Sequence, residues 1–231
     1  MSEQPTLARV LDSAARLQEI VPDAVLVGGS AAAFYAGHRE SFDHDHVLAE
    51  LTTRYAEVVE AVEATEGWAT SVRASSPPVT LLGSLDGVEA GLRQLRRTRP
   101  LEVEVVDVRG HALRVPTHEE ILRVKAYLVV QRNQVRDYVD VVALADRLGA
   151  EHAVLVICGI DGYYADRSGE PDSVLTVLVQ RLAEPAPRDS RVIGQLSSYK
   201  GLVERWQDWG AVVEECHALA DAVVERLEGE S

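Results

Sequence analysis

The sequence of 231 residues is poor in cysteine and contains no long apolar run. Its two cysteines, Cys158 and Cys216, lie far apart and form neither a disulfide framework nor a metal-ligand spacing, which is typical of a reducing compartment. No apolar stretch approaches the roughly 20 residues that span a bilayer. The first residues also lack the basic segment and apolar run of a signal peptide. We therefore expect a cytoplasmic protein that does not bind a membrane.

Positive charge is scarce as well, because the formal net charge is −14. A surplus of negative charge repels a phosphate backbone at long range, so the chain is not expected to bind double-stranded DNA. A local basic patch remains compatible with this balance. Only two of the 23 basic residues, Lys125 and Lys200, are lysines, so a lysine at a given position is informative.

Composition and periodicity predict a globular α+β protein, with 46% hydrophobic and 26% charged residues. Strands and helices alternate up to about residue 150, and the rest of the chain has only helical patterns. We expect a first domain over residues 1–150 and a helical C-terminal domain over 151–231. The expected strands are 24–27, 41–48, 79–85 and 100–110, and the expected helices before residue 150 are 5–20, 31–37, 53–65, 89–97, 119–132 and 137–148.

A glycine turn, Gly28-Gly29-Ser30, lies between the first strand and a short helix. Backbone N–H groups and a hydroxyl at a helix N-terminus attract phosphate. The alternative is a tight turn in which Ser30 only caps the helix. The segment has neither the G-x-G-x-x-G spacing of a dinucleotide fold nor the G-K-[ST] of a P-loop.

Two aspartates, Asp43 and Asp45, stand one residue apart in the strand that follows. Side chains at i and i+2 of a strand share a face, so the two carboxylates converge and repel each other unless a cation binds or one is protonated. Carboxylate oxygens favour Mg²⁺ together with a phosphate. His44 and His46 point the other way, which splits the ligands that zinc would need. A solvated edge strand is the alternative.

A third carboxylate is sought in the strand LEVEVVDV, where Glu102 and Glu104 share one face and Asp107 lies on the other. A glutamate beside the aspartate strand would complete a cage for two metals, which assists phosphoryl transfer. We favour Glu104 over Glu102. Read alone, the segment favours the alternative of a half-buried strand that has a polar solvent face.

Lys125 lies in an apolar helical setting and is followed by the stretch RDYVD. Such a lysine can act as a point charge on a triphosphate, or it can lie at the surface with its stem on apolar neighbours. Asp137 is expected to cap the next helix. Asp140, one turn later, either orients the lysine or is exposed.

Four arginines fall within residues 93–99 of this acidic chain. A solvated helix end is the usual interpretation of such a run. The alternative is a patch for the phosphates of a nucleotide or RNA.

The order of these motifs resembles the polymerase-β-like nucleotidyltransferase superfamily, in which a strand, Gly-Gly-Ser/Thr, a helix and an Asp-x-Asp strand follow one another. Within it, GGSAAAFYAGHRESFDHD and KAYLVVQRNQVRDYVD are similar to the AbiEii-type group of abortive-infection and type IV toxin–antitoxin systems. The resemblance covers about residues 24–148. It implies a small mixed sheet flanked by helices.

The resemblance also implies roles for individual residues. Gly28, Gly29 and Ser30 would hold the phosphates of a nucleoside triphosphate, Lys125 would contact them, and Asp137 or Asp140 would match the later acid of the family. Asp43, Asp45 and Glu104 would bind Mg²⁺ or Mn²⁺. The acceptor would be tRNA or a protein hydroxyl, and an antitoxin would be a partner.

A different class of function fits the same residues. The chain is then a non-catalytic module that binds a nucleotide or a protein and keeps the nucleotidyltransferase fold. An open cleft with three convergent carboxylates favours the enzyme, and a glutamate pair turned to solvent favours the binding module.

Overall fold

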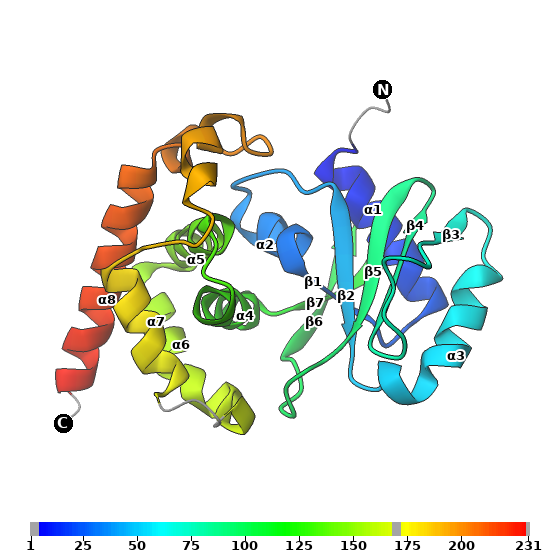
Figure 1. The fold of residues 1–231 in the computed structure, drawn as a ribbon, viewed down its shortest axis with the longest axis horizontal. Coiled ribbons are helices and arrows are strands. Elements are labelled where there is room, and N and C mark those ends of the chain that lie inside the picture. The colour runs from blue at the N-terminus through cyan, green and yellow to red at the C-terminus, as the bar shows by residue number, and fades with distance from the viewer. Residues whose placement is uncertain (1–4, 168–171, 230–231) are drawn as a thin grey trace. The chain divides into compact units, whose positions relative to one another are not determined.

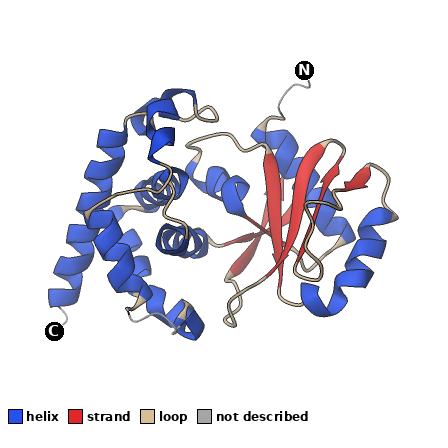
Figure 2. Cartoon of the chain, in the orientation of Figure 1, coloured by secondary structure: helices blue, strands red, loops and turns tan. Residues whose placement is uncertain are grey.

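The structure is a computed structural model and describes residues 5–167 and 172–229. The chain divides into two compact units, one formed by Met1–Phe34 and Glu40–Thr117 and the other by Tyr35–Arg39 and His118–Ser231. The first unit contains both helices and strands, and the described part of the second contains helices, as Figure 2 shows. The units therefore divide between Thr117 and His118, not at the predicted residue 150. The reason is that α4 and α5 pack with the later helices.

The first unit is built on a mixed five-stranded sheet with the order β1-β2-β5-β4-β3 (Figure 1). β2 and β5 are parallel, and the other neighbours are antiparallel. The strands are β1 (Val25–Val27), β2 (Asp43–Leu48), β3 (Trp68–Thr70), β4 (Thr80–Leu85) and β5 (Val88–Gln94), and the accompanying helices are α1 (Leu7–Ile20), α2 (Gly28–Ala36) and α3 (Leu51–Glu63). The expected strands at 24–27, 41–48 and 79–85 and the helices at 5–20, 31–37 and 53–65 are confirmed.

The turn between β4 and β5 corrects one prediction. Asp86 and Gly87 both have positive φ, of 51° and 78°, the conformation that an Asp-Gly pair gives to a two-residue hairpin. Residues 88–94 therefore return as a strand, and the predicted helix over 89–97 is wrong. Val88, Ala90 and Leu92 are buried at a period of two, which outweighs the helical propensity of Glu89 and Arg93.

One face of this sheet carries the hydrophobic core of the first unit. Leu48 of β2 and Leu92 of β5 pack there with Leu17 of α1 and Leu51 of α3. Alternate residues of each strand must then lie on the other face. Even-numbered positions of β2 and β5 thus face the core, and odd-numbered positions face away from it.

Two histidines of β2 belong to this buried layer. His44 and His46 are 1% and 0% exposed, and the hydroxyl of Ser13 lies 3.0 Å from Nε2 of His44. Burial lowers the pKa of His44 to about 4, against the opposing effect of Asp43, and lowers the pKa of His46 well below its ordinary value. Both rings are neutral at pH 7.

A two-stranded sheet completes the first unit. It consists of β6 (Val103–Val108) and β7 (His111–Pro116), joined through Arg109-Gly110. The strand expected at 100–110 is confirmed, whereas β7 and β3 were not predicted. β7 contacts α1 through Gln18, whose side chain donates to the carbonyl of Arg114 and accepts from its N–H.

The second unit is helical in the part that the structure describes. Tyr138 is fully buried at its centre and meets Trp209 edge to face, with ring centroids 5.9 Å apart. The α-helices are α4 (His118–Gln131), α5 (Val135–Leu148), α6 (Ala150–Cys158), α7 (Val174–Ala183) and α8 (Trp209–Gly229), and the 3-10 helices are η1 (Ile160–Tyr163), η2 (Ala165–Arg167), η3 (Ser190–Ser198) and η4 (Glu204–Trp206). The helices expected at 119–132 and 137–148 are confirmed.

The lengths and hydropathy of the helices bear on membrane insertion. Within residues 5–167 and 172–229, none is both long enough and apolar enough to cross a bilayer.

The buried histidines predict a dependence of stability on pH. An unfolded histidine binds a proton near its ordinary pKa of 6.5, whereas His44 in the folded chain does so only near 4. The free energy of unfolding should therefore be highest above pH 6.5 and fall between pH 6.5 and 4, by up to about 1.4 kcal/mol per pH unit for each histidine. Urea unfolding across this range should show a shallower slope for His44→Gln. The exposed His217→Gln serves as control, and an equal slope in wild type and His44→Gln would contradict the assignment.

Candidate active site

The face of the sheet opposite the core carries the two aspartates. Asp43 and Asp45 are partly exposed, while His44 between them is buried. The alternation predicted from the sequence is therefore confirmed. A pocket of about 590 Å³ opens over this face, and its lining consists of Asp43, His44, Asp45, Ala69, Thr70, Ser71, Leu82, Gly83, Ser84, Gly87, Glu89, Ala90, Gly91 and Arg93.

The carboxylate of Asp45 lies over a glycine of the neighbouring strand. A Cβ on Gly91 would come within 2.4 Å of Oδ1 of Asp45, so a larger residue at 91 would displace the carboxylate. Gly28 lies close by as well, because its absent Cβ would be 3.5 Å from Oδ2 of Asp45. Nε of Arg93 lies 3.1 Å from Oδ1 and forms an ion pair with it. Asp45 thus occupies a space that Gly91 leaves open, whereas a side chain at Gly28 would only touch it.

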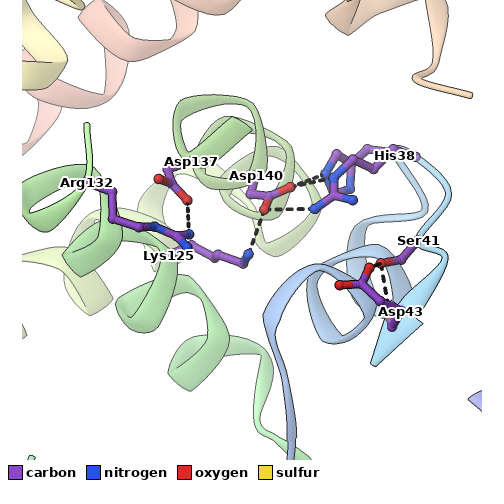
Figure 3. Close-up of polar contacts among 8 residues, drawn as sticks. His38, Ser41, Asp43, Lys125, Arg132, Asp137 and Asp140 are labelled. Atoms are coloured by element: carbon purple, nitrogen blue, oxygen red, sulfur yellow. Dashed lines mark hydrogen bonds and ion pairs between the residues drawn. The ribbon is translucent and has the colours of Figure 1, made fainter. Parts of the chain in front are cut away.

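Asp43 is held at the beginning of β2. The hydroxyl of Ser41 lies 3.4 Å from its Oδ1 (Figure 3). Ser30 donates a hydrogen bond to the main-chain oxygen of Asp43. Ser30 is also 1% exposed and lies inside α2, which starts at Gly28. The expectation that Ser30 caps the helix is therefore wrong, and its hydroxyl fixes the strand that carries the acids.

The glycine turn has a backbone conformation that favours glycine. Gly28 has a φ of +74°, in the region that favours glycine, and begins α2 directly after β1. Whether Gly28, Gly29 and Ser30 bind phosphate stays a prediction.

The expected position of the third carboxylate is wrong. Glu104 lies on β6, which pairs with β7 in a separate sheet rather than with β2. Glu104 is exposed, and Glu102 precedes the strand. Over the described residues, no three His, Cys, Asp or Glu side chains form a group that could hold a metal ion. The carboxylate cage predicted with Glu104 is thus not assembled.

Glu89 is the acid that the sequence analysis missed. It is the register partner of Asp43 on β5 and lines the same pocket. Residues paired across parallel strands point to the same side of the sheet. Only the pairing of β5 with β2 reveals this, because residues 89–97 were read as a helix.

The second unit contains a buried ionic cluster formed by Asp140, Lys125, Arg39 and His38. Figure 3 labels Asp140, Lys125 and His38. Nζ of Lys125 lies 2.7 Å from Oδ2 of Asp140. Nε of Arg39 lies 2.9 Å from Oδ1, and its Nη2 lies 3.1 Å from Oδ2. Nε2 of His38 lies 2.7 Å from Oδ1. Asp140 is therefore buried and bound to Lys125, which excludes the alternative of an exposed Asp140. Its role in orienting Lys125 for a nucleotide stays a prediction.

Burial and charge act against each other in this cluster. Burial alone would raise the pKa of Asp140, but Arg39, Lys125 and His38 hold it well below its ordinary value. Burial lowers the pKa of Lys125, and the carboxylate of Asp140 opposes this effect. Since the side chain of Lys125 is 3% exposed and its ammonium is already bound to Asp140, Lys125 is not the surface lysine of the alternative interpretation. A contact between Lys125 and a triphosphate stays a prediction.

Asp137 pairs with a different cation. Its Oδ1 lies 2.6 Å from Nη2 of Arg132, and the carboxylate is fully buried. The expectation that Asp137 caps its helix is wrong, because α5 begins at Val135 after the N-cap residue Gln134. Its predicted role in nucleotide binding is untested.

Comparison with solved structures identifies the fold. JHP933 from Helicobacter pylori aligns over 95% of this chain and 91% of its own, with a TM-score of 0.54 and 17% identity. The antibiotic-resistance factor ANT(2'')-Ia aligns over 69% of this chain and 94% of its own, with a TM-score of 0.50 and 14% identity. A further H. pylori structure, named only provisionally as a nucleotidyltransferase, covers 100% of this chain and 99% of its own at a TM-score of 0.46 and 14% identity. The fold is nucleotidyltransferase-like.

Sequence comparison adds a partial match. The heme uptake protein MmpL11 of Mycobacterium tuberculosis is 35% identical over 131 residues, which is 56% of this chain and 13% of that protein. The mycolic acid-containing lipids exporter MmpL11 of Mycolicibacterium smegmatis is 33% identical over 140 residues, 59% of this chain and 14% of its own length. The chain therefore spans about one eighth of these curated relatives. No protein-family model matches it.

The arginine run at residues 93–99 was expected at the end of a helix, and this expectation is wrong. Arg93 belongs to β5, and Arg97 is 7% exposed. Arg97 donates to the carbonyl oxygens of Arg99 and Pro100, at 2.9 and 3.0 Å. Arg97 therefore holds the loop, whereas Arg96 and Arg99 are exposed. A role of the run in binding phosphates is untested.

The buried cluster predicts a large effect for Asp140→Asn. Loss of the carboxylate leaves Lys125 and Arg39 buried without their shared anion, which should lower the free energy of unfolding by about 3–5 kcal/mol. Asp146→Asn is the matched control on the same helix, because Asp146 forms only an exposed pair with Arg205 and should cost less than about 1 kcal/mol. Urea unfolding at pH 7 measures both. Equal losses for the two variants would contradict the account of the cluster.

Proposed function

We propose that the chain is a Mg²⁺-dependent nucleotidyltransferase that moves a nucleotide from a nucleoside triphosphate to an acceptor hydroxyl. The observation that carries this proposal is the pair Asp43 and Asp45, which share one open face of the sheet and line a pocket. The fold, which is nucleotidyltransferase-like, is consistent with it.

The donor set fits a hard divalent cation. Asp43 and Asp45 supply carboxylate oxygens, the ligands that Mg²⁺ and Mn²⁺ prefer together with phosphate oxygens and water. A bound Mg²⁺ would supply positive charge to the reacting phosphate and to the leaving pyrophosphate. Gly91 keeps room for the carboxylate of Asp45, and Ser30 fixes the backbone of Asp43. In this proposal Glu89 takes the place that Glu104 had in the sequence analysis.

The acceptor and the cellular role rest on the resemblance to the AbiEii-type group. We propose tRNA or a protein hydroxyl as acceptor and a toxin countered by an antitoxin as the role, acting in the cytoplasm. The net charge of −14 works against an RNA acceptor, because long-range repulsion slows the approach of a polyanion. The protein hydroxyl is for this reason the first acceptor to test.

A non-catalytic nucleotide-binding module is the second candidate. The observation that favours it is Arg93, which already neutralises Asp45 at 3.1 Å. A site that has its own cation does not require a metal to separate its two acids.

Transfer of label from α-³²P-labelled nucleoside triphosphates separates the two candidates. With Mg²⁺ and either total tRNA or a protein acceptor, wild type should transfer label. Asp45→Asn should lower the rate by about 100-fold or more, because a metal contributes several kcal/mol to such a reaction. Asp146→Asn, the same change on α5, is the control. Transfer that is equal in wild type and Asp45→Asn would disprove the metal assignment, and no transfer to any acceptor would favour the binding module.

The third carboxylate is tested by a matched pair of variants. Glu89→Gln should lower the same transfer rate by about tenfold or more, since it removes one negative charge beside the two aspartates that are proposed to bind the metal. Glu104→Gln, an exposed glutamate on the separate β6–β7 sheet, should leave it within about twofold. Loss of activity in Glu104→Gln with a normal Glu89→Gln would restore the role that the sequence analysis gave to Glu104.

A further inference from the structure

Arg93 is the one residue with a permanent positive charge among the described residues that line the pocket. It lies on β5, two residues after Gly91 and on the same face. Its Nε lies 3.1 Å from Oδ1 of Asp45, and the two side chains are 44% and 30% exposed. The pair is therefore in contact with solvent and with the pocket, and is not a core ion pair like that of Asp140.

Arg93 and a divalent cation need the same oxygen. A metal at Asp45 would carry two positive charges next to a guanidinium that is already within hydrogen-bond distance of Oδ1, and like charges at such separations repel. An exposed ion pair is weak, so a divalent cation can displace the arginine. Gly91 would still leave the carboxylate its space after the arginine has moved.

A displaced Arg93 remains on the wall of the pocket. Its guanidinium is planar, always charged and suited to bind phosphate oxygens through two parallel hydrogen bonds. The described pocket lining offers no lysine or other arginine for that purpose. The anion that a metal brings to this site is the triphosphate of the nucleotide.

We propose that Arg93 is a positioning residue that exchanges Asp45 for the phosphates of the nucleotide when a divalent cation binds. This inference rests on the function proposed above. The metal takes Asp45 from the Arg93–Asp45 pair, and the triphosphate takes Arg93. Each ligand therefore favours binding of the other, because coupling of this kind is reciprocal. Without metal, Arg93 holds Asp45 and partly closes the site to cations.

The test uses the full chain, Mn²⁺ and the non-hydrolysable analogue α,β-methylene-ATP. Binding of Mn²⁺ alone, measured by electron paramagnetic resonance, should be about fivefold tighter in Arg93→Gln than in wild type. Binding of the analogue in saturating Mn²⁺, measured by calorimetry, should be about tenfold weaker. Arg96→Gln is the matched control, since Arg96 is exposed and belongs to the same arginine run. It should change both constants less than twofold.

Loss of any positive charge nearby favours a cation and disfavours an anion, so the direction of the two changes alone does not show exchange. Arg96→Gln removes the same charge from a residue that does not line the pocket, and its comparison with Arg93→Gln separates exchange at Asp45 from a general effect of charge. Equal behaviour of Arg93→Gln and Arg96→Gln would overturn the inference, and so would tighter Mn²⁺ binding without weaker binding of the analogue. If wild type binds Mn²⁺ and Asp45→Asn does not, the proposed metal site stands whatever Arg93 does. If neither wild type nor Arg93→Gln binds Mn²⁺, the proposed function fails together with the inference. Thermal melts verify that the variants are folded.

Discussion

The alternation of side chains along β2 is the constraint on which the site depends. Because one face of the sheet packs against α1 and α3, His44 and His46 are buried beneath it, and Asp43 and Asp45 must lie on the opposite face. A shift of the strand by one residue would bury both acids and expose both histidines. The hydrophobic core therefore fixes the position of the two carboxylates as firmly as any contact within the pocket.

The second unit depends on a different interaction, the buried carboxylate of Asp140. It joins Lys125 of α4 to His38 and Arg39, which lie about 100 residues earlier in the sequence. These contacts explain why Tyr35–Arg39 belongs to the helical unit although its neighbours on both sides belong to the other. Lys125 is fixed by this carboxylate rather than held ready at a surface.

Sequence reasoning reached the residues whose positions depend on local rules. The faces of β2 follow from its period of two. The return strand after Asp86-Gly87 was predicted as a helix, although an Asp-Gly pair favours a hairpin. Sequence reasoning failed where pairing with distant segments decides the secondary structure. Residues 89–97 are good helix formers, and only their pairing with β2 and β4 makes most of them a strand. Glu89 and Arg93 were missed as pocket residues for this reason. Glu104 was placed beside the aspartates because a sequence pattern does not show that its strand, β6, pairs with β7 instead.

The central claim is that the face of the sheet with Asp43 and Asp45 binds a divalent cation together with a nucleotide. A crystal of the protein grown with Mn²⁺ and a non-hydrolysable nucleoside triphosphate tests it most directly, through the anomalous signal of the metal. The account predicts an anomalous peak about 2.0–2.3 Å from carboxylate oxygens of both aspartates and from phosphate oxygens of the nucleotide. A nucleotide bound with no metal at these carboxylates, or with the Arg93–Asp45 pair still intact, would contradict it.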